Sequence, residues 1–298
     1  MTLPDLHSLF STDDKCREYL KRLRWPNGIT CPRCAHPAVS TLKQQGKFEC
    51  AKCEYQFSVT AGTLFHDSKL PLEKWFLTVL LMVESKKGMS ANQIKRTIGV
   101  SYKTAWYLCH RVRAAMTETN PELLSGTIEV DETYVGGKRR GVGKARALDN
   151  KVMALGAIAR GGDIRLTVAA NRKATTKVLR KFIAQTTAKG PKTIHTDEWP
   201  AYLSAMDNDT THKRVNHSAK EWVRGKVHTN TMEGAFSLFK RAMVGAYHHL
   251  SAKHLDSYLD EFEFRYNGRK RSDLFAETLR RLATTEAMSF QKLIREAK

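Results

Sequence analysis

The pattern of apolar and polar positions predicts mainly helices in the first third of the chain. A helix is expected over residues 11–24, where Ser11 or Thr12 can cap the start and basic residues fill the last turn. Residues 72–83 are apolar on nearly all sides, a pattern that predicts a buried helix. The longest apolar run, residues 75–83, is far shorter than the ~20 residues that cross a bilayer, so no membrane segment is expected.

Two further helices are expected around a short turn that contains Gly99. The first runs over residues 90–99 and the second starts at Val100, an order typical of a helix-turn-helix. An amphipathic helical linker would show the same pattern, so both interpretations stay open. In the helix-turn-helix interpretation, the second helix presents partly exposed side chains to groove edges and phosphates. These side chains are Tyr102, Lys103, Trp106, His110 and Arg113.

After residue 126 the pattern alternates between short apolar strands and amphipathic helices, which predicts an α/β domain. Strands are expected within residues 126–138 and over 152–159, 164–170, 193–196 and 212–217. Helices are expected over residues 175–187, 231–244 and 251–266, and near 272–283 and 286–296. The helix over 231–244 has one apolar stripe, formed by Met232, Phe236, Phe239 and Met243.

The chain is strongly basic, with 50 Lys and Arg residues against 30 Asp and Glu residues and a net charge of +20. Because the excess is spread over every segment, a polyanion such as nucleic acid is the expected partner. A merely soluble basic protein is the alternative. The N-terminus lacks a basic region followed by an apolar core, so no secretory signal is expected. A cytoplasmic location is expected instead.

Four of the six cysteines form two CxxC pairs separated by fifteen residues. Each pair turns two thiolates toward one point, and two pairs make the four-sulfur tetrahedron of a structural zinc site. One Zn²⁺ bound by Cys31, Cys34, Cys50 and Cys53 is therefore expected, in a ribbon of short strands. Since a domain of ~40 residues has little core, the metal should supply much of its folding free energy. A redox-active dithiol pair is the alternative.

Acidic residues in the α/β domain form a candidate site for divalent cations. Asp131 interrupts an apolar strand, where a carboxylate is costly unless a divalent ion, or alternatively a nearby Arg or Lys, pairs with it. Asp197 ends a strand, and ligands of α/β sheets bind at strand ends. Glu233 and Lys240 share one helix face, which is also typical of an exposed salt-bridged surface. Together the three acids would hold two ions for phosphoryl transfer.

Several strings in the sequence resemble the DDE transposases of bacterial insertion sequences, most closely the subgroup with an N-terminal zinc ribbon. The strings include CPRC, VDETYVGGK, HTDEWPAY, HTNTMEG and YHHLSAKHLDSYLDEFEFRYNGR, and the likeness covers nearly the whole chain. It implies an RNase H-like catalytic domain with a mixed sheet, in which Asp131 and Asp197 are the first two acids. The third position varies in that subgroup between Glu and Asn, so Glu233 and Asn230 are both candidates. Glu233 is preferred because an ionised carboxylate binds a hard cation better than an amide does.

The resemblance implies an enzyme that cleaves DNA at the ends of an insertion sequence and transfers those ends to a target. Its cofactors would be two Mg²⁺ (or Mn²⁺) ions, with Lys240 holding a phosphate or the DNA end. Its partners would be terminal inverted repeats and target DNA, bound by a homodimer or higher oligomer associated with the nucleoid. A non-catalytic DNA-binding protein derived from a transposase is the alternative, and a non-transposing nuclease is a third interpretation.

Four segments are expected from these patterns. They are an N-terminal helix plus zinc ribbon over 1–62, a helix-turn-helix segment over 63–125, the catalytic domain over 126–270 and C-terminal helices over 271–298. DNA contacts are expected from the helix residues Lys103, Trp106 and Arg113 and from the basic loop residues Lys138, Arg139, Arg140, Lys144 and Arg146.

Three residues next to the expected catalytic acids are expected to have other roles. Glu132 adjoins Asp131 on the strand and should point to the opposite face, so a structural role is expected. The same reasoning applies to Glu198 beside Asp197. Trp199 would either stack on an unpaired base or pack in the core.

Overall fold

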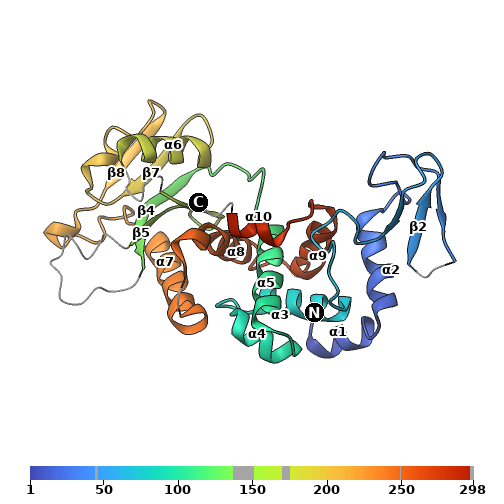
Figure 1. The fold of residues 1–298 in the computed structure, drawn as a ribbon. Helices are drawn as coiled ribbons and strands as arrows, with labels where there is room; N and C mark the ends of the chain where they lie inside the picture. The colour runs from blue at the N-terminus through green and yellow to red at the C-terminus, as the bar shows by residue number, and fades with distance from the viewer. Residues whose placement is uncertain (44–45, 137–150, 170–174, 249, 296–298) are drawn as a thin grey trace. The chain divides into compact units, whose positions relative to one another are not determined.

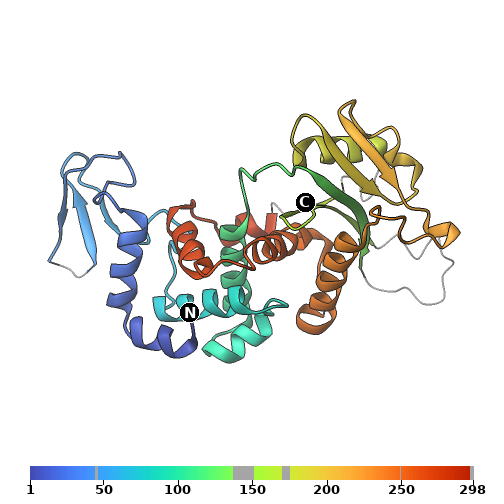
Figure 2. The same ribbon diagram turned by 180° about the vertical axis from the view of Figure 1, so that it is seen from behind.

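The computed structural model divides the chain into two units, whose elements are shown from opposite sides in Figure 1 and Figure 2. One unit combines Met1–Thr117 with Lys270–Lys298, and the other is Glu118–Arg269. The structure describes residues 1–43, 46–136, 151–169, 175–248 and 250–295. The C-terminal helices, which the sequence suggests as a separate segment, are thus grouped with the N-terminal unit.

A three-stranded antiparallel ribbon lies near the N-terminus, as the cysteine pattern predicts. Its strands are β1 (Val39–Thr41), β2 (Lys47–Cys50) and β3 (Gln56–Ser58), in the order β1-β2-β3. The rings of Phe48 and Phe57 contact each other and Trp25. Phe48 and Phe57 lie in the ribbon's small core together with Cys31, Cys50 and Ala61, and Trp25 packs against it.

The remaining elements of the first unit are helices. They are α1 (Leu3–Leu9), α2 (Asp13–Arg24), α3 (Leu72–Glu84), α4 (Ala91–Ile98), α5 (Tyr102–Met116), α9 (Leu274–Thr284) and α10 (Phe290–Arg295). Helix α3 is buried as predicted, and the ring of its Phe76 contacts Phe10 and Phe275. Helix α1 was not expected from the sequence because it has only seven residues, but a capping box between Thr2 and Asp5 fixes its start.

Helices α4 and α5 lie on either side of a short turn at Gly99, as the sequence predicts. Ser90 and Ser101 cap their N-termini, and Gly99 ends α4 with a left-handed φ of 64°. However, the expectation that His110 and Arg113 are partly exposed is wrong, since both are 1% exposed. The second half of α5 packs against α3 and α9, and that contact buries residues that a single helix pattern left open.

The second unit contains the predicted mixed sheet. Its strands are β4 (Thr127–Val135), β5 (Val152–Ala159), β6 (Ile164–Val168), β7 (Lys192–Thr196) and β8 (Thr210–Arg214). The spatial order is β6-β5-β4-β7-β8. Strands β4, β5 and β6 pair antiparallel, whereas β7 runs parallel to both β4 and β8.

Helices cover both faces of this sheet (Figure 1). Helix α6 (Thr176–Thr186) packs on one face, and α7 (Asn230–Ala242) and α8 (Leu255–Asn267) pack on the other. Met232, Phe236 and Phe239 of the predicted apolar stripe of α7 lie in the core between the sheet and helices α7 and α8. Shorter helices are η3 (Pro200–Tyr202), η4 (His217–Ala219), η5 (Met243–Tyr247) and η6 (Ala252–His254). No helix in the described part of the chain is long and apolar enough to cross a membrane.

The edge strand β6 is capped by polar side chains of α8. Asn267 Oδ1 accepts from Ile164 N at 2.8 Å, Glu263 Oε2 accepts from Leu166 N at 2.8 Å, and Asp256 Oδ1 accepts from Val168 N at 3.1 Å. Backbone groups that an edge would leave open are therefore satisfied, which protects the sheet from pairing with other chains.

The last strand ends earlier than the pattern predicts, at Arg214 instead of residue 217. The backbone N–H groups of His217 and Ser218 donate to the carboxylate of Glu198 at 2.8 and 2.9 Å. The Glu198 side chain thus accepts backbone hydrogen bonds in place of a neighbouring strand, and the chain turns there. Strand periodicity does not reveal this change of partner.

Candidate functional site

The four cysteines of the ribbon converge on one point. Their sulfur atoms lie within 4.8 Å of one another, and the Sγ–Sγ distances are 3.7 Å for Cys31–Cys53, 3.6 Å for Cys34–Cys50 and 3.4 Å for Cys34–Cys53. All four are free thiols. A tetrahedral zinc with Zn–S bonds of about 2.3 Å requires sulfurs about 3.8 Å apart, so the residues fit a structural Zn²⁺.

The two cysteine turns have the same backbone geometry. Ala35 N donates to Cys31 O, and Glu54 N donates to Cys50 O, both at 2.9 Å. Ala35 and Glu54 each follow the second cysteine of their pair and adopt a left-handed φ of 58° and 54°. This repeated turn aims both sulfurs of each pair inward, as the CxxC spacing predicts.

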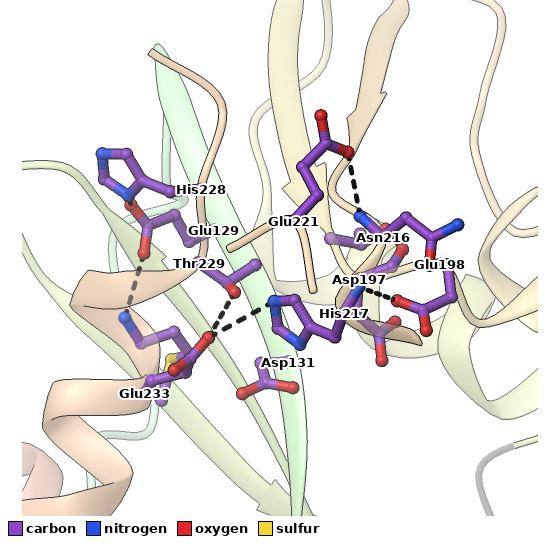
Figure 3. A network of polar contacts seen from close by, with 12 residues as sticks. Glu129, Asp131, Asp197, Glu198, Asn216, His217, Glu221, His228, Thr229 and Glu233 are labelled. Atoms are coloured by element: carbon purple, nitrogen blue, oxygen red, sulfur yellow. Dashed lines mark hydrogen bonds and ion pairs between the residues drawn. The ribbon is translucent and has the colours of Figure 1, made fainter. Parts of the chain in front are cut away.

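A cleft of about 550 Å³ in the second unit brings together the predicted catalytic residues of β4 and α7. Asp131 of β4 lines it together with Glu233 and Lys240, which lie two turns apart on one face of α7. Figure 3 shows the carboxylates of Asp131, Asp197 and Glu233 around a common space. Asp197 directly follows β7, where its Oδ1 accepts from Trp199 N at 3.0 Å. Asn230 lies at the first position of α7 and is exposed.

The charges of these acids act on one another. Burial, followed by the charges of Glu132, Asp197 and Glu233, raises the pKa of Asp131 to about 8. Burial also raises the pKa of Asp197, and the charges of Glu198 and Glu233 add to that effect. Such mutual repulsion in a partly buried cleft would be relieved by a cation. Carboxylate oxygens are the donors that Mg²⁺ prefers, so the residues fit such an ion chemically.

The carboxylates at the cleft lie farther apart than the sulfur atoms of the four cysteines. In the described part of the chain, the cysteines are the only group of three or more potential ligands within 4.8 Å of one another. Because Mg²⁺ commonly keeps several waters, protein carboxylates need not all contact the ion directly.

The neighbouring glutamates have structural partners, although Glu132 also lines the cleft beside Asp131. Glu132 Oε2 accepts from Tyr202 Oη at 2.6 Å, and Tyr202 belongs to the core on the α6 face. Glu198 holds the turn after β8, and hydrogen bonds from Ser218 and His217 lower its pKa to about 2. Trp199 is half-buried and packs against the same core as Tyr202, at a ring distance of 6.1 Å.

Glu129 is a buried acid that sequence reasoning missed. It is fully buried on β4, and its carboxylate accepts from Thr231 N at 2.7 Å, Met232 N at 3.0 Å and Arg160 Nε at 2.7 Å. His228 Nδ1 lies 3.2 Å from the same carboxylate. The acid therefore caps the N-terminus of α7, the helix that carries Glu233. Its two-residue spacing from Asp131 was the available signal, because such residues share a strand face.

A glycine allows α7 to approach the sheet closely. Gly156 pairs with Asp131 across β5 and β4. A Cβ at this position would lie 2.5 Å from Met232 Cε and 2.8 Å from Phe236 Cζ. A larger residue here would force Met232 and Phe236 to shift, so glycine favours the close packing of α7 on the sheet.

His217 is a second residue that the sequence did not single out. Its Nε2 lies 3.8 Å from Glu233 Oε1 and has no hydrogen-bond partner (Figure 3). Glu233 Oε1 also accepts from Thr229 Oγ1 at 2.7 Å. Glu233 is therefore hydrogen-bonded to Thr229 just before its own helix and lies near His217 of the loop after β8.

The expected DNA-binding residues have different surroundings. Lys103 is exposed, and its Nζ lies 4.8 Å from the ring centroid of Phe290. Trp106 is half-buried against His110 and Phe290. Arg113 is buried and is removed from the predicted DNA contacts. The basic loop residues Lys138, Arg139, Arg140, Lys144 and Arg146 lie outside the described residues.

Comparison with known protein families covers both regions of the chain. Residues 123–267 match the family model of the ISXO2-like transposase domain, and residues 11–56 match that of the transposase zinc-ribbon domain. The chain belongs to the insertion-sequence transposases that carry a zinc ribbon. In this transposase, the mixed sheet with helices on both faces is the RNase H-like fold that the sequence predicts.

A curated relative supports this assignment. The transposase is 29% identical over 274 residues to a protein of Halobacterium salinarum described as an uncharacterized protein in transposable element ISH50. The alignment covers 86% of this chain and 91% of the relative. A simian T-cell lymphotropic virus intasome in complex with PP2A regulatory subunit B56 gamma matches at 12% identity over 63% of this chain. The match covers 64% of that chain, which is less than two thirds of it. At a TM-score of 0.30 the likeness is too weak to support a conclusion about this chain.

We expect the purified transposase to contain one zinc per chain, and Cys50→Ser to reduce that content to nearly none. The ribbon should then unfold, because the metal is expected to supply much of its folding free energy. Elemental analysis after reducing purification measures the metal, and proteolysis measures ribbon unfolding. Cys16→Ala, which changes a buried cysteine outside the cluster, is the matched control. Zinc-free wild-type protein with an intact ribbon would contradict the assignment.

Proposed function

We propose that this transposase cleaves DNA at the ends of its own insertion sequence and joins those ends to a target DNA. The observation that carries the proposal is that Asp131 and Glu233 line one cleft, and that the charges of Asp197 and Glu233 both act on Asp131. Each acid comes from a different element of the transposase domain. The relative described as a protein in a transposable element agrees with a role in moving such an element.

Asp131, Asp197 and Glu233 are proposed to hold two Mg²⁺ (or Mn²⁺) ions. Bound there, the ions would supply activation of water and neutralisation of charge on the phosphate that reacts. Glu233 is favoured over Asn230 as the third ligand because it lines the cleft with Asp131 and its charge affects both aspartates. Thr229 and His217 would keep its carboxylate oriented toward the cleft.

Lys240 is proposed to bind a DNA phosphate at the same cleft. It is exposed on the cleft side of α7, and Arg241 beside it also lines the cleft. In the reaction, water attacks the phosphorus at the element end and the bond to the 3′-oxygen breaks, which leaves a free 3′-hydroxyl. That hydroxyl then attacks a target phosphodiester and displaces another 3′-oxygen, so one bond forms for each bond broken.

The helix-turn-helix and the ribbon are proposed to recognise the terminal inverted repeats. Lys103 and Tyr102 are exposed at the start of α5, where a recognition helix contacts base edges. The basic loop over residues 138–146 is proposed to bind phosphates of both element and target DNA. Joining two element ends calls for two catalytic sites, so a homodimer or higher oligomer on DNA is part of the proposal.

We expect the two groups of basic residues to have different effects on DNA binding. Replacing Lys103 and Tyr102 by Ala should lower the ratio of specific to random affinity, because they would contact base edges. Neutralising the five loop charges should weaken both affinities equally and reduce the salt slope by up to about four units. Salt titrations on an element-end duplex and a scrambled duplex measure both. A loop variant that alone loses specificity would reverse the assignment.

The function itself is tested by a strand-cleavage and strand-transfer assay on labelled duplexes that carry the repeats flanking the gene. Wild-type protein should nick the element ends with Mg²⁺ and join them to a second duplex, and chelation should stop both steps. Specific DNA binding without any cleavage in Mg²⁺ or Mn²⁺ would instead identify a non-catalytic DNA-binding protein derived from a transposase.

A further inference from the structure

The loop between β8 and α7 exposes two large apolar side chains beside the cleft. Trp222 is 56% exposed and Val223 is 50% exposed. Single exposed apolar side chains are common, whereas adjacent ones that form a patch often mark contact with a ligand or partner. The loop therefore needs an explanation that the roles of the three acids do not supply.

This loop has a defined conformation. Its start is held by Glu198, which accepts from the backbone of His217, and by Asn216 Oδ1, which accepts from Ala219 N at 3.0 Å. Its end is closed by reciprocal backbone hydrogen bonds between Arg224 and Val227 at 2.9 and 3.0 Å. The indole is thus presented on a supported turn.

The indole is linked to the third acid through one side chain. The ring of Trp222 lies 4.7 Å from the ring of His217 at an angle of 45°. His217 Nε2 in turn lies 3.8 Å from Glu233 Oε1 (Figure 3). A ligand stacked on the open face of Trp222 would therefore lie close to whatever phosphate reacts at the three acids.

The charge of the same loop identifies the kind of ligand. Lys220, Arg224 and Lys226 are all exposed around Trp222, whereas Glu221 is the one acid from residue 217 to residue 228. An exposed aromatic ring among cationic side chains is the surface on which unpaired nucleobases stack while phosphates are neutralised. A protein or lipid partner would not require this position beside the acids.

We propose that Trp222 stacks on an unpaired DNA base next to the phosphate that is cleaved. The proposal rests on the proposed function, because it assumes that DNA occupies the cleft. Trp199, the tryptophan that the sequence suggested for such stacking, packs on the core instead. Stacking would stabilise a frayed or extruded base and so hold the adjacent phosphate at the acids.

The test compares the affinities of two duplexes of equal length, one fully paired and one with unpaired ends. Wild-type protein should bind the duplex with unpaired ends more tightly. In Trp222→Ala the ratio of the two affinities should fall by about 5- to 150-fold. Trp222→Phe should restore most of it because it keeps an aromatic face. Val223→Ala is the matched control, since it removes an equally exposed neighbour without a ring. A fluorescent purine analogue at the unpaired position should be quenched by the wild type and by Val223→Ala only.

The outcomes separate this proposal from the proposed function. Unchanged preference and quenching in Trp222→Ala, together with normal cleavage, would overturn the stacking role and leave the enzyme assignment intact. A preference for unpaired ends that depends on Trp222, in a protein that does not cleave DNA, would support stacking and contradict the proposed cleavage activity. Equal weakening by Trp222→Ala and Val223→Ala would show a general apolar contact and also overturn stacking.

Discussion

Asp131→Asn should abolish magnesium-dependent strand cleavage, with a fall of about a thousandfold or more, while DNA affinity stays within about threefold. The amide keeps the shape of the side chain, and its oxygen can still accept from Glu132 N, which donates to Asp131 Oδ1 at 2.8 Å. It removes the charge that would hold the ions. Affinity should persist because most of it comes from phosphate contacts elsewhere. A labelled duplex that reports cleavage and binding measures both quantities.

Asp197→Asn and Glu233→Gln should have the same effect as Asp131→Asn, with cleavage lost and DNA affinity kept. Asp163→Asn is the matched control, because it makes the same chemical change at an exposed turn of the same unit. Melting temperature gives a readout that does not depend on activity: Mg²⁺ should raise it for the wild type and for the control, but not for Asp131→Asn. Substantial cleavage by any one variant would exclude that acid, and an active Glu233→Gln beside an inactive Asn230→Ala would move the third ligand to Asn230.

Glu129→Ala should lower the free energy of unfolding by about 3–5 kcal/mol, the largest loss of stability that we expect from one substitution. It would leave the buried N–H groups of Thr231 and Met232 without their acceptor and Arg160 without its anion. Glu129→Gln, which keeps one acceptor oxygen, should cost less stability. Urea unfolding measures both.

The position of α7 should also depend on Glu129. In Glu129→Gln protein that remains folded, cleavage should fall more than DNA affinity, because Glu233 is carried by the helix that Glu129 caps. Asp163→Ala is the control for losing an ion pair, and its cost should stay below about 1 kcal/mol because its carboxylate is exposed. A Glu129→Ala variant as stable as that control would show that the capping network contributes little.

Local patterns in the sequence were sufficient for most elements and for the zinc ribbon. The CxxC spacing predicts the cysteine cluster because each pair builds its own turn, so little long-range information is needed. Strand and helix periodicity likewise predicts the α/β domain and the apolar stripe of α7, whereas the mixed sheet was expected from the resemblance to the transposases. The placement of Asp131 on a strand, Asp197 at a strand end and Glu233 on a helix follows from the same local signals.

Only the tertiary structure decided which side chains are buried or share partners. Arg113 looks exposed on a single helix, yet α3 and α9 pack over that half of α5. The role of Glu129 depends on α7, which is about a hundred residues away in sequence, and so does the need for Gly156. The contact of Trp222 with His217 depends on a turn held by Glu198. Periodicity states which face of one element is apolar, but burial and polar pairing depend on which other element packs there.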